Sequence, residues 1–351
     1  MLTCGKPANQ SALTAIPQRS MIEVQVETRI EEQAERSPVL MAKARIEMQR
    51  RQQVKRTESL RCPHCRQFTT QAMSFFLHVL DFSQFCAEGD LKALIKFITN
   101  EEGPECLEMT DDNGLTPLHY STQNGQEMLV KETVKRGGKH LIEKRTKVQE
   151  EPTPIHLAAK RGHVSVVNLL LDIGGDRFLT IQDKYGRTIV GVAAEEGQLA
   201  VLRAIVERKG VDFILSLESN GLTIFHDAAF GGHVSVLQQL VDWTGTPMAL
   251  ESFNQYGLTP LHMSASGNRV EAIEYLLKEG GVTLLQKTNT LGNTPMHLAC
   301  LQGNREAVMC MINKEGGREL LRKTNRRGKT PIDLAKWRGH EDLTTELERT
   351  G

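Results

Sequence analysis

The chain has 351 residues, of which 39% are hydrophobic and 5% aromatic, and its 43 Lys and Arg residues balance its 43 Asp and Glu residues. This composition is ample for an elongated array but thin for the compact core of an enzyme, and we expect no nucleic-acid partner. No apolar run reaches the roughly 18 residues that a membrane-spanning helix needs, and the first residues lack the layout of a signal peptide. The 7 cysteines follow no framework spacing, which predicts reduced thiols in a cytoplasmic protein, with a nuclear location left open.

Residues 1–73 are predicted to form an N-terminal extension of low order. Residues 1–20 are polar and small, which is typical of disorder. Residues 21–36 and 39–58 indicate polar helices, and the second of these is basic and rich in strong helix formers. Because it has too few apolar positions to pack alone, it is either a solvated helix or a segment that orders on a partner.

Two cysteines of the extension, Cys62 and Cys65, have the spacing of half a zinc site. Structural zinc sites use four N or S ligands, usually in two closely spaced pairs. The second pair on offer, His78 and Cys86, does not have a standard spacing. We therefore predict no bound metal and interpret Cys62 and Cys65 as exposed thiols in a linker, although they are the candidates for a metal site.

Residues 74–351 carry a pattern that recurs about every 36 residues. Its clearest form is Gly-x-Thr-Pro-x-His, and its threonine falls at positions 116, 153, 188, 223, 259, 294 and 330, in steps of 37, 35, 35, 36, 35 and 36 residues. A fixed period of this length indicates stacked supersecondary units, which bind partners along an extended face. A degenerate unit with Gly89 in register precedes Thr116, so we predict about eight repeats of 35–37 residues.

Each unit predicts two helices and a turn. The Thr is placed to N-cap a first helix, and Pro is well tolerated at the first helical position. A Gly nine residues after the Thr suits a left-handed helix end, and apolar residues at helical spacing then indicate a second helix. The apolar pair that follows is interpreted as an added turn whose side chains stack between units; the pairs are Phe178-Leu179, Ile214-Leu215, Leu284-Leu285 and Leu320-Leu321.

Two units depart from the pattern. The unit at 186–220 has Ile189 and Gly191 where others have Pro and His. In the unit at 257–291, a Gly follows Thr259 after eight residues instead of nine, at Gly267. We read this as one missing residue, and we expect the first helix of that unit to be tightened or to end early.

The run His156-Leu-Ala-Ala159 with Gly162-His163 resembles the ankyrin-repeat family, and the resemblance covers roughly residues 84–350. It implies an all-α solenoid of helix-turn-helix units without catalytic activity. It also implies that the pattern histidines join hydrogen bonds between neighbouring repeats. Farther upstream, Arg50-Arg-Gln-Gln53-Val54-Lys55-Arg56-Thr57 resembles a docking element of phosphatase-targeting ankyrin subunits, but Thr57 stands where that element has an aromatic residue.

The resemblance places partner-facing residues at the loop tips and before the Gly between the two helices. Aromatic and Arg residues dominate binding hot spots, and adjacent patches of opposite charge favour one register of binding. The locally basic stretches 43–66 and 314–329 are interpreted as solvated faces. The candidate partner-binding residues are Lys160, Arg161, Tyr185, Glu195, Glu196, Phe230, Tyr256, Leu301, Gln302, Trp337 and Arg338.

No Gly-rich phosphate loop or Gly-x-Ser-x-Gly motif occurs, so we predict no enzyme, no cofactor and no small-molecule ligand. Two functional hypotheses remain. In the first, the protein is an adaptor or scaffold that binds a protein partner through the concave face of the array. In the second, it is a targeting subunit, in which residues 43–75 dock an enzyme such as a type-1 protein phosphatase and the array selects the substrate.

Overall fold

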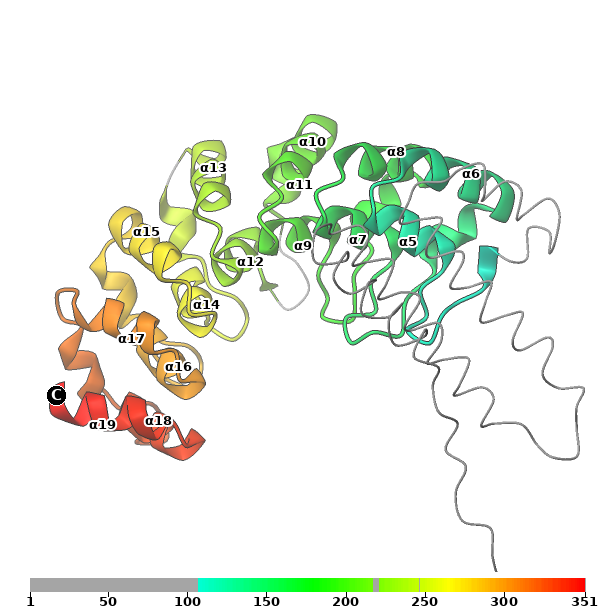
Figure 1. Ribbon diagram of the computed structural model, residues 1–351. Coiled ribbons are helices and arrows are strands. Elements are labelled where there is room, and N and C mark those ends of the chain that lie inside the picture. The colour runs from blue at the N-terminus through cyan, green and yellow to red at the C-terminus, as the bar shows by residue number, and fades with distance from the viewer. Residues whose placement is uncertain (1–106, 217–220, 246, 351) are drawn as a thin grey trace, which may run out of the picture. The chain divides into compact units, whose positions relative to one another are not determined.

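The computed structural model describes residues 107–216, 221–245 and 247–350 (Figure 1). Several predictions lie outside these residues: the boundary between 73 and 74, the basic helix 39–58, the cysteines Cys62 and Cys65, the docking motif at 50–57 and the degenerate unit around Gly89. The described part of the chain contains helices and loops but no strand. None of its helices is both long and apolar enough to cross a membrane.

Each described unit contributes a first helix of 7 or 8 residues and a second helix of 8 to 11 residues. Neighbouring first helices contact one another along the whole described array, as do most neighbouring second helices, so the predicted all-α solenoid is confirmed (Figure 1). The first helices are α5 (Pro117–Gln123), α7 (Pro154–Lys160), α9 (Ile189–Glu195), α12 (Ile224–Gly231), α14 (Pro260–Ser266), α16 (Pro295–Gln302) and α18 (Pro331–Arg338). The second helices are α6 (Glu127–Gly137), α8 (Val164–Gly174), α10 (Leu199–Lys209), α13 (Val234–Thr244), α15 (Val270–Gly280), α17 (Arg305–Ile312) and α19 (Glu341–Thr350).

The hydrophobic core lies between the two rows of helices. Helix α8 shows how it is built, because Val166, Val167, Leu170 and Leu171 form a stripe at helical spacing that is fully buried. The first helices face this stripe with small residues such as Ala158. Each unit leaves its apolar stripe open unless a neighbour covers it, so the stability of the array is approximately a sum over units and their interfaces.

A third short helix follows each second helix from α6 to α17, and most of these short helices carry the predicted apolar pair. Phe178 and Leu179 are buried, and so are the pairs Leu284-Leu285 and Leu320-Leu321, whereas Leu215 is half-buried. These short helices pack under the second helices, which confirms the interpretation of the longer repeat. They are η3 (Lys139–Glu143), η4 (Asp176–Leu179), α11 (Val211–Ile214), η6 (Pro247–Glu251), η7 (Val282–Gln286) and η8 (Arg318–Arg322).

The start of each first helix is fixed by a reciprocal contact between its Thr and the residue three positions later. In α14, the Thr259 hydroxyl lies 2.9 Å from Nδ1 of His262, and the Thr259 backbone N–H donates to the same nitrogen at 3.1 Å. The imidazole thus takes the place of the carboxylate in a capping box. The same arrangement occurs at Thr116, Thr153, Thr223 and Thr294, and Asp333 replaces the His at Thr330.

The unit that begins at Thr259 has no missing residue, contrary to the prediction. Helix α14 has 7 residues, as α7 does. Asn268, nine residues after Thr259, adopts the left-handed conformation at φ 57° that Gly adopts there in the other units. Gly267 occupies the position before it with φ −87°. The prediction placed the helix end at Gly267 because the pattern has a Gly there. The left-handed conformation requires only a residue that tolerates positive φ, and Asn does.

Two glycines at the C-terminal ends of first helices allow close packing in the middle of the array. A Cβ atom on Gly231 would lie 2.0 Å from the carbonyl oxygen of Glu195, and one on Gly267 would lie 2.8 Å from the carbonyl oxygen of Phe230. Helices α9, α12 and α14 therefore approach one another as closely as they do because these positions have no side chain. Gly191 is a different case: it stands where the His belongs, and a Cβ there would lie 2.8 Å from Oδ2 of Asp227 in the next unit.

Candidate functional site

Five of the loops that precede the first helices are held by an Asp or Asn five residues before the Thr. Asn254 Oδ1 accepts hydrogen bonds from the backbone N–H groups of Tyr256 and Leu258, both at 2.9 Å. This Asx turn fixes the tip residue, and the next tip is joined to it because Thr290 N donates to Tyr256 O at 2.8 Å. This turn has a sequence signature that the Gly-x-Thr-Pro-x-His pattern does not include. The residues at this position are Asp111, Asp183, Asn254, Asn289 and Asn325.

The loop tips and the C-terminal ends of the first helices together form a surface that we call the first-helix face. The predicted aromatic residues lie on it and are exposed: Tyr185 by 45%, Phe230 by 36%, Tyr256 by 52% and Trp337 by 72%. The burial of the core does not require them. Large apolar side chains held at exposed positions by a rigid scaffold are typical of binding surfaces.

The predicted charged residues of this face largely neutralise one another. Lys160 Nζ lies 3.3 Å from carboxylate oxygens of both Glu150 and Glu196. Burial alone would lower the pKa of Lys160, but the two carboxylates hold it above its ordinary value. Arg161, the next residue, is exposed. The patches of opposite sign expected here are thus ion pairs between neighbouring units, and Arg161 is the charge that faces solvent.

Arg187 fills the space beside these ion pairs. Its guanidinium contacts the Asp183 carboxylate at 2.6 Å, that of Glu150 at 3.6 Å and also that of Glu195. Burial would lower the pKa of Arg187, but the hydrogen bond to Asp183 and the charges of Asp183 and Glu195 hold it above its ordinary value. A half-buried cation with several hydrogen-bonded partners fixes the geometry of its surroundings. Glu195 is therefore a partner of Arg187 in the folded array.

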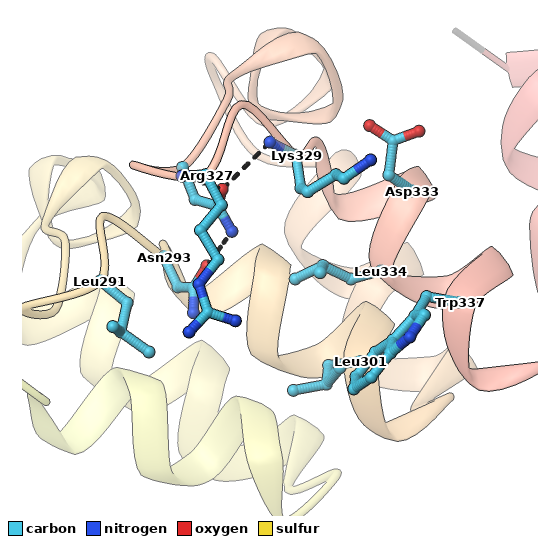
Figure 2. A pocket seen from close by; sticks show the side chains of 9 residues that line it. Leu291, Asn293, Leu301, Arg327, Lys329, Asp333, Leu334 and Trp337 are labelled. Atoms are coloured by element: carbon cyan, nitrogen blue, oxygen red, sulfur yellow. Dashed lines mark hydrogen bonds between the residues drawn. The ribbon is translucent and has the colours of Figure 1, made fainter.

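A pocket of about 390 Å³ lies at the C-terminal end of the first-helix face (Figure 2). Its apolar walls are Leu291 from a loop tip, Leu301 from α16, and Leu334 and Trp337 from α18. Polar side chains at its rim include Arg327, Lys329 and Asp333. Leu301 and Trp337 were predicted as partner-binding residues, and the structure brings them together; Gln302 and Arg338 follow them as exposed neighbours. Arg338 stacks its guanidinium 5.0 Å from the centre of the Trp337 ring.

The last loop places a different side chain beside this space than the loop before α9 does. The residue before the Thr is Arg187 in the unit of α9, where it packs inward on Asp183 and Glu195. The equivalent residue in the last unit is Lys329, which is exposed. Sequence periodicity identified the positions, but it could not show that side chains of these two units leave a pocket between them.

The five pattern histidines have structural roles. Nδ1 of His119 accepts from the backbone N–H of Thr116 at 3.0 Å, while Nε2 lies 3.1 Å from the carbonyl oxygen of Lys144. These partners assign the neutral tautomer with the proton on Nε2. Burial lowers the pKa to about 4 for each member of the set, which is His119, His156, His226, His262 and His297. Within the described residues, no three His, Cys, Asp or Glu side chains are grouped as metal ligands would be.

Comparisons with known proteins agree with this geometry. A family model described as ankyrin repeats (3 copies) matches residues 129–216 and 192–288, and one described as ankyrin repeat matches residues 291–325. A stretch of 98 residues, 26% of this chain, is 32% identical to part of the FYVE zinc finger domain protein UPA1 of Mycosarcoma maydis. The match spans 7% of the length of that protein.

Proposed function

Because the chain belongs to the ankyrin-repeat family, we propose that it is a non-enzymatic adaptor that binds a protein partner through its first-helix face. Ankyrin repeats imply protein partners, and the finer assignment rests on one observation. The face holds a row of exposed apolar side chains, of which Phe230 and Tyr256 are the central members, on a scaffold whose other pattern residues are buried.

The surroundings of Phe230 support this assignment. The residue that follows it is Gly231, and the equivalent residue of the next unit is Gly267, so the packed helices surround the ring with little side-chain bulk. The backbone at this point is fixed, because Phe230 O accepts from Nε of Arg269 at 2.9 Å. A large ring on a rigid backbone loses little conformational entropy when a partner covers it.

The proposal is tested by purifying partners of the full chain, identifying one by mass spectrometry, and measuring its affinity with purified proteins. The double variant Phe230→Ala and Tyr256→Ala should weaken the complex by at least roughly thirtyfold, since a hot-spot aromatic contributes about 2 kcal/mol or more. Arg161→Glu should slow association, because an exposed charge at an interface acts mainly on the association rate. Lys160 is less suitable for this test, since its reversal would break the ion pairs with Glu150 and Glu196.

Met128→Ala is the matched control. Met128 is a large apolar residue exposed by 59%, but it lies on the second helix α6 and outside the first-helix face. We expect its removal to leave both the affinity and the thermal unfolding curve unchanged. If Met128→Ala weakens the complex and the double variant does not, the partner binds the second helices and the assignment of the face is wrong.

A further inference from the structure

We propose that the pocket at the C-terminal end of the first-helix face binds an extended acidic peptide segment that carries a large apolar side chain. The apolar side chain enters between Leu291, Leu334 and Trp337, and the flanking carboxylates lie against Arg327 and Lys329. This inference rests on the proposed function, because it names the chemistry of a partner for one part of the same face.

The walls of the pocket indicate an apolar anchor. Leu291 lies on one side of the space and Leu334, Leu301 and Trp337 lie on the other, with the Arg327 side chain extending between them (Figure 2). Leu291 is exposed by 49% although it belongs to a rigid loop, so it leaves apolar surface in contact with water. A volume of about 390 Å³ lies at the lower end of the roughly 300–1,000 Å³ range of ligand pockets and suits one or two large side chains.

The charge around the pocket selects an acidic partner. Residues 322–329 contain five Lys or Arg residues and no Asp or Glu. Among the described residues, no ion pair engages Arg327 or Lys329 in the way that three carboxylates engage Arg187. The one carboxylate at the rim, Asp333, accepts a hydrogen bond from the backbone N–H of Thr330 at 2.9 Å and offsets part of the charge of Lys329, so Arg327 supplies the remaining positive charge. The rim therefore presents net positive charge to a partner.

The openness of the site favours a peptide over a small molecule. Ligand pockets bury most of a small ligand's surface, roughly 70–90% of it. Here the wall residue Trp337 is itself 72% exposed, so the site covers only one side of whatever it holds. The pocket also continues the loop-tip row, since Arg326 N donates to Leu291 O at 3.0 Å and Thr290 N donates to Tyr256 O at 2.8 Å. An extended chain that follows this row reaches the pocket without a break.

The test is fluorescence anisotropy with the full chain and a short fluorescein-labelled peptide, Gly-Ser-Glu-Asp-Leu-Phe-Asp-Glu-Gly-Ser. Two comparison peptides replace either Leu-Phe by Gly-Ser or the four acidic residues by Lys. We expect the first peptide to bind at least about tenfold more tightly than either comparison peptide, and its affinity to fall as salt screens the charges. Equal binding of the peptide without Leu-Phe would overturn the proposal, because charge alone would then explain the affinity, and so would the absence of binding to the first peptide.

Protein variants locate the binding site. Trp337→Ala and Leu291→Ser remove walls from two different units, and Arg327→Glu reverses the rim charge; each should weaken binding by at least roughly tenfold. Met128→Ala and Lys131→Glu are matched controls, an exposed apolar residue and an exposed cation on α6 outside the first-helix face, and should leave peptide binding unchanged. If the pocket variants bind normally while the controls do not, the peptide lies elsewhere and the inference fails. The proposed function survives that failure if Phe230→Ala and Tyr256→Ala still weaken the complex with the whole partner.

A direct readout comes from Trp337 itself. Trp243 on α13 is partly buried, so replacing it with Phe leaves Trp337 as the fluorescent tryptophan of the described array. In the Trp243→Phe protein, the peptide should shift Trp337 emission to shorter wavelength as the ring leaves water. An unchanged emission spectrum at saturating peptide would show that the peptide does not occupy the pocket. This measurement does not depend on whether the pocket variants fold.

Discussion

Nε2 of His262 lies 3.0 Å from the carbonyl oxygen of Asn293, 31 residues farther along the chain, and so ties the start of one helix to the loop of the next unit. Equivalent ties join His156 to Arg187, His226 to Leu258 and His297 to Lys329. In each, the backbone N–H of the Thr holds Nδ1 as an acceptor and the Nε2 proton points at a carbonyl oxygen. A second proton on the ring would lie on Nδ1 and face the backbone N–H of the Thr, which is itself a donor. These hydrogen bonds between units therefore require neutral imidazoles.

The array should lose stability as the pH falls from about 6.5 to about 4. The pKa of each buried pattern His is lowered from 6.5 to about 4, so between these values the unfolded chain binds protons that the folded chain does not. The stabilisation is complete above the unfolded pKa, and each His removes about 1.4 kcal/mol per pH unit across the window. Urea unfolding at a series of pH values measures this slope. A constant free energy of unfolding between pH 7 and 5 would contradict the tautomer assignment.

The variant His262→Gln tests whether the slope belongs to these residues. It should lower the stability at pH 7 but make the pH dependence shallower by about one proton, or about 1.4 kcal/mol per pH unit. Carboxylates such as Asp333, whose pKa is lowered by the Thr330 backbone N–H, act below this window. An unaltered slope in the variant would assign the acid sensitivity to other groups.

Replacing His262 with Ala should destabilise the array by about 2–4 kcal/mol. The change leaves a cavity and removes the partners of the Thr259 N–H and the Asn293 carbonyl oxygen, and each unsatisfied buried polar group costs about 1–3 kcal/mol. The exposed His140, which contacts Glu108 at 3.0 Å, supplies the control, and His140→Ala should change the stability by less than about 1 kcal/mol. Chemical denaturation of both variants at pH 7.5 gives the comparison; similar costs would show that the tie contributes nothing of its own.

Thr259→Ala should cost about 1 kcal/mol, whereas Thr259→Ser should be close to neutral. The hydroxyl lies 2.9 Å from Nδ1 of His262, and Ser keeps it while Ala does not. Circular dichroism melts of the two variants separate the hydroxyl from the methyl group. Equal melting temperatures for Ala and Ser would mean that the cap is held by the backbone N–H alone.

Asn268→Ala should cost more than Asn268→Gly, by about 1 kcal/mol. Gly tolerates the left-handed φ of 57° at least as well as Asn, whereas Ala does not. Both variants lose the bond in which Ala307 N donates to Oδ1 of Asn268 at 3.0 Å, so the difference between them reports the backbone conformation. If Gly is the more harmful of the two in denaturation experiments, the greater freedom of Gly in the unfolded chain outweighs the strain of Ala at this φ.

Gly231→Ala should be among the most destabilising single substitutions in the array, at about 2–3 kcal/mol. The new Cβ atom would meet the Glu195 carbonyl oxygen at 2.0 Å, and backbone must move to make room. The neighbouring Phe230→Ala, by contrast, should stay within roughly 0.5 kcal/mol because the ring is exposed. Thermal melts of the two proteins decide the matter, and a stable Gly231→Ala protein would show that α9 and α12 can separate without loss.

The sequence predicted the array well because the residues of the Thr-Pro-x-His element determine the backbone conformation near them. Thr, Pro and the left-handed Gly each constrain the backbone within a few residues, so helix starts and ends follow from their spacing. The left-handed conformation of Asn268 was not predicted, because the repeat pattern was defined by Gly at that position and not by the backbone conformation that Gly adopts there. The sequence also could not predict the ion pair of Lys160 with Glu196 or the pocket beside Trp337. Both depend on how side chains of different units meet across an interface.

The missing tie at Gly191 has a mechanical consequence. Among the described units, the one that begins at Thr188 has no imidazole to reach the following loop; its contacts with the next unit include the close packing at Gly231 and the Arg203–Gln239 hydrogen bond. A linear array under load behaves as springs in series, in which extension concentrates at the most compliant joint. We expect that joint to lie between α9 and α12, and a partner that spans it would stiffen the whole array by bridging that joint alone.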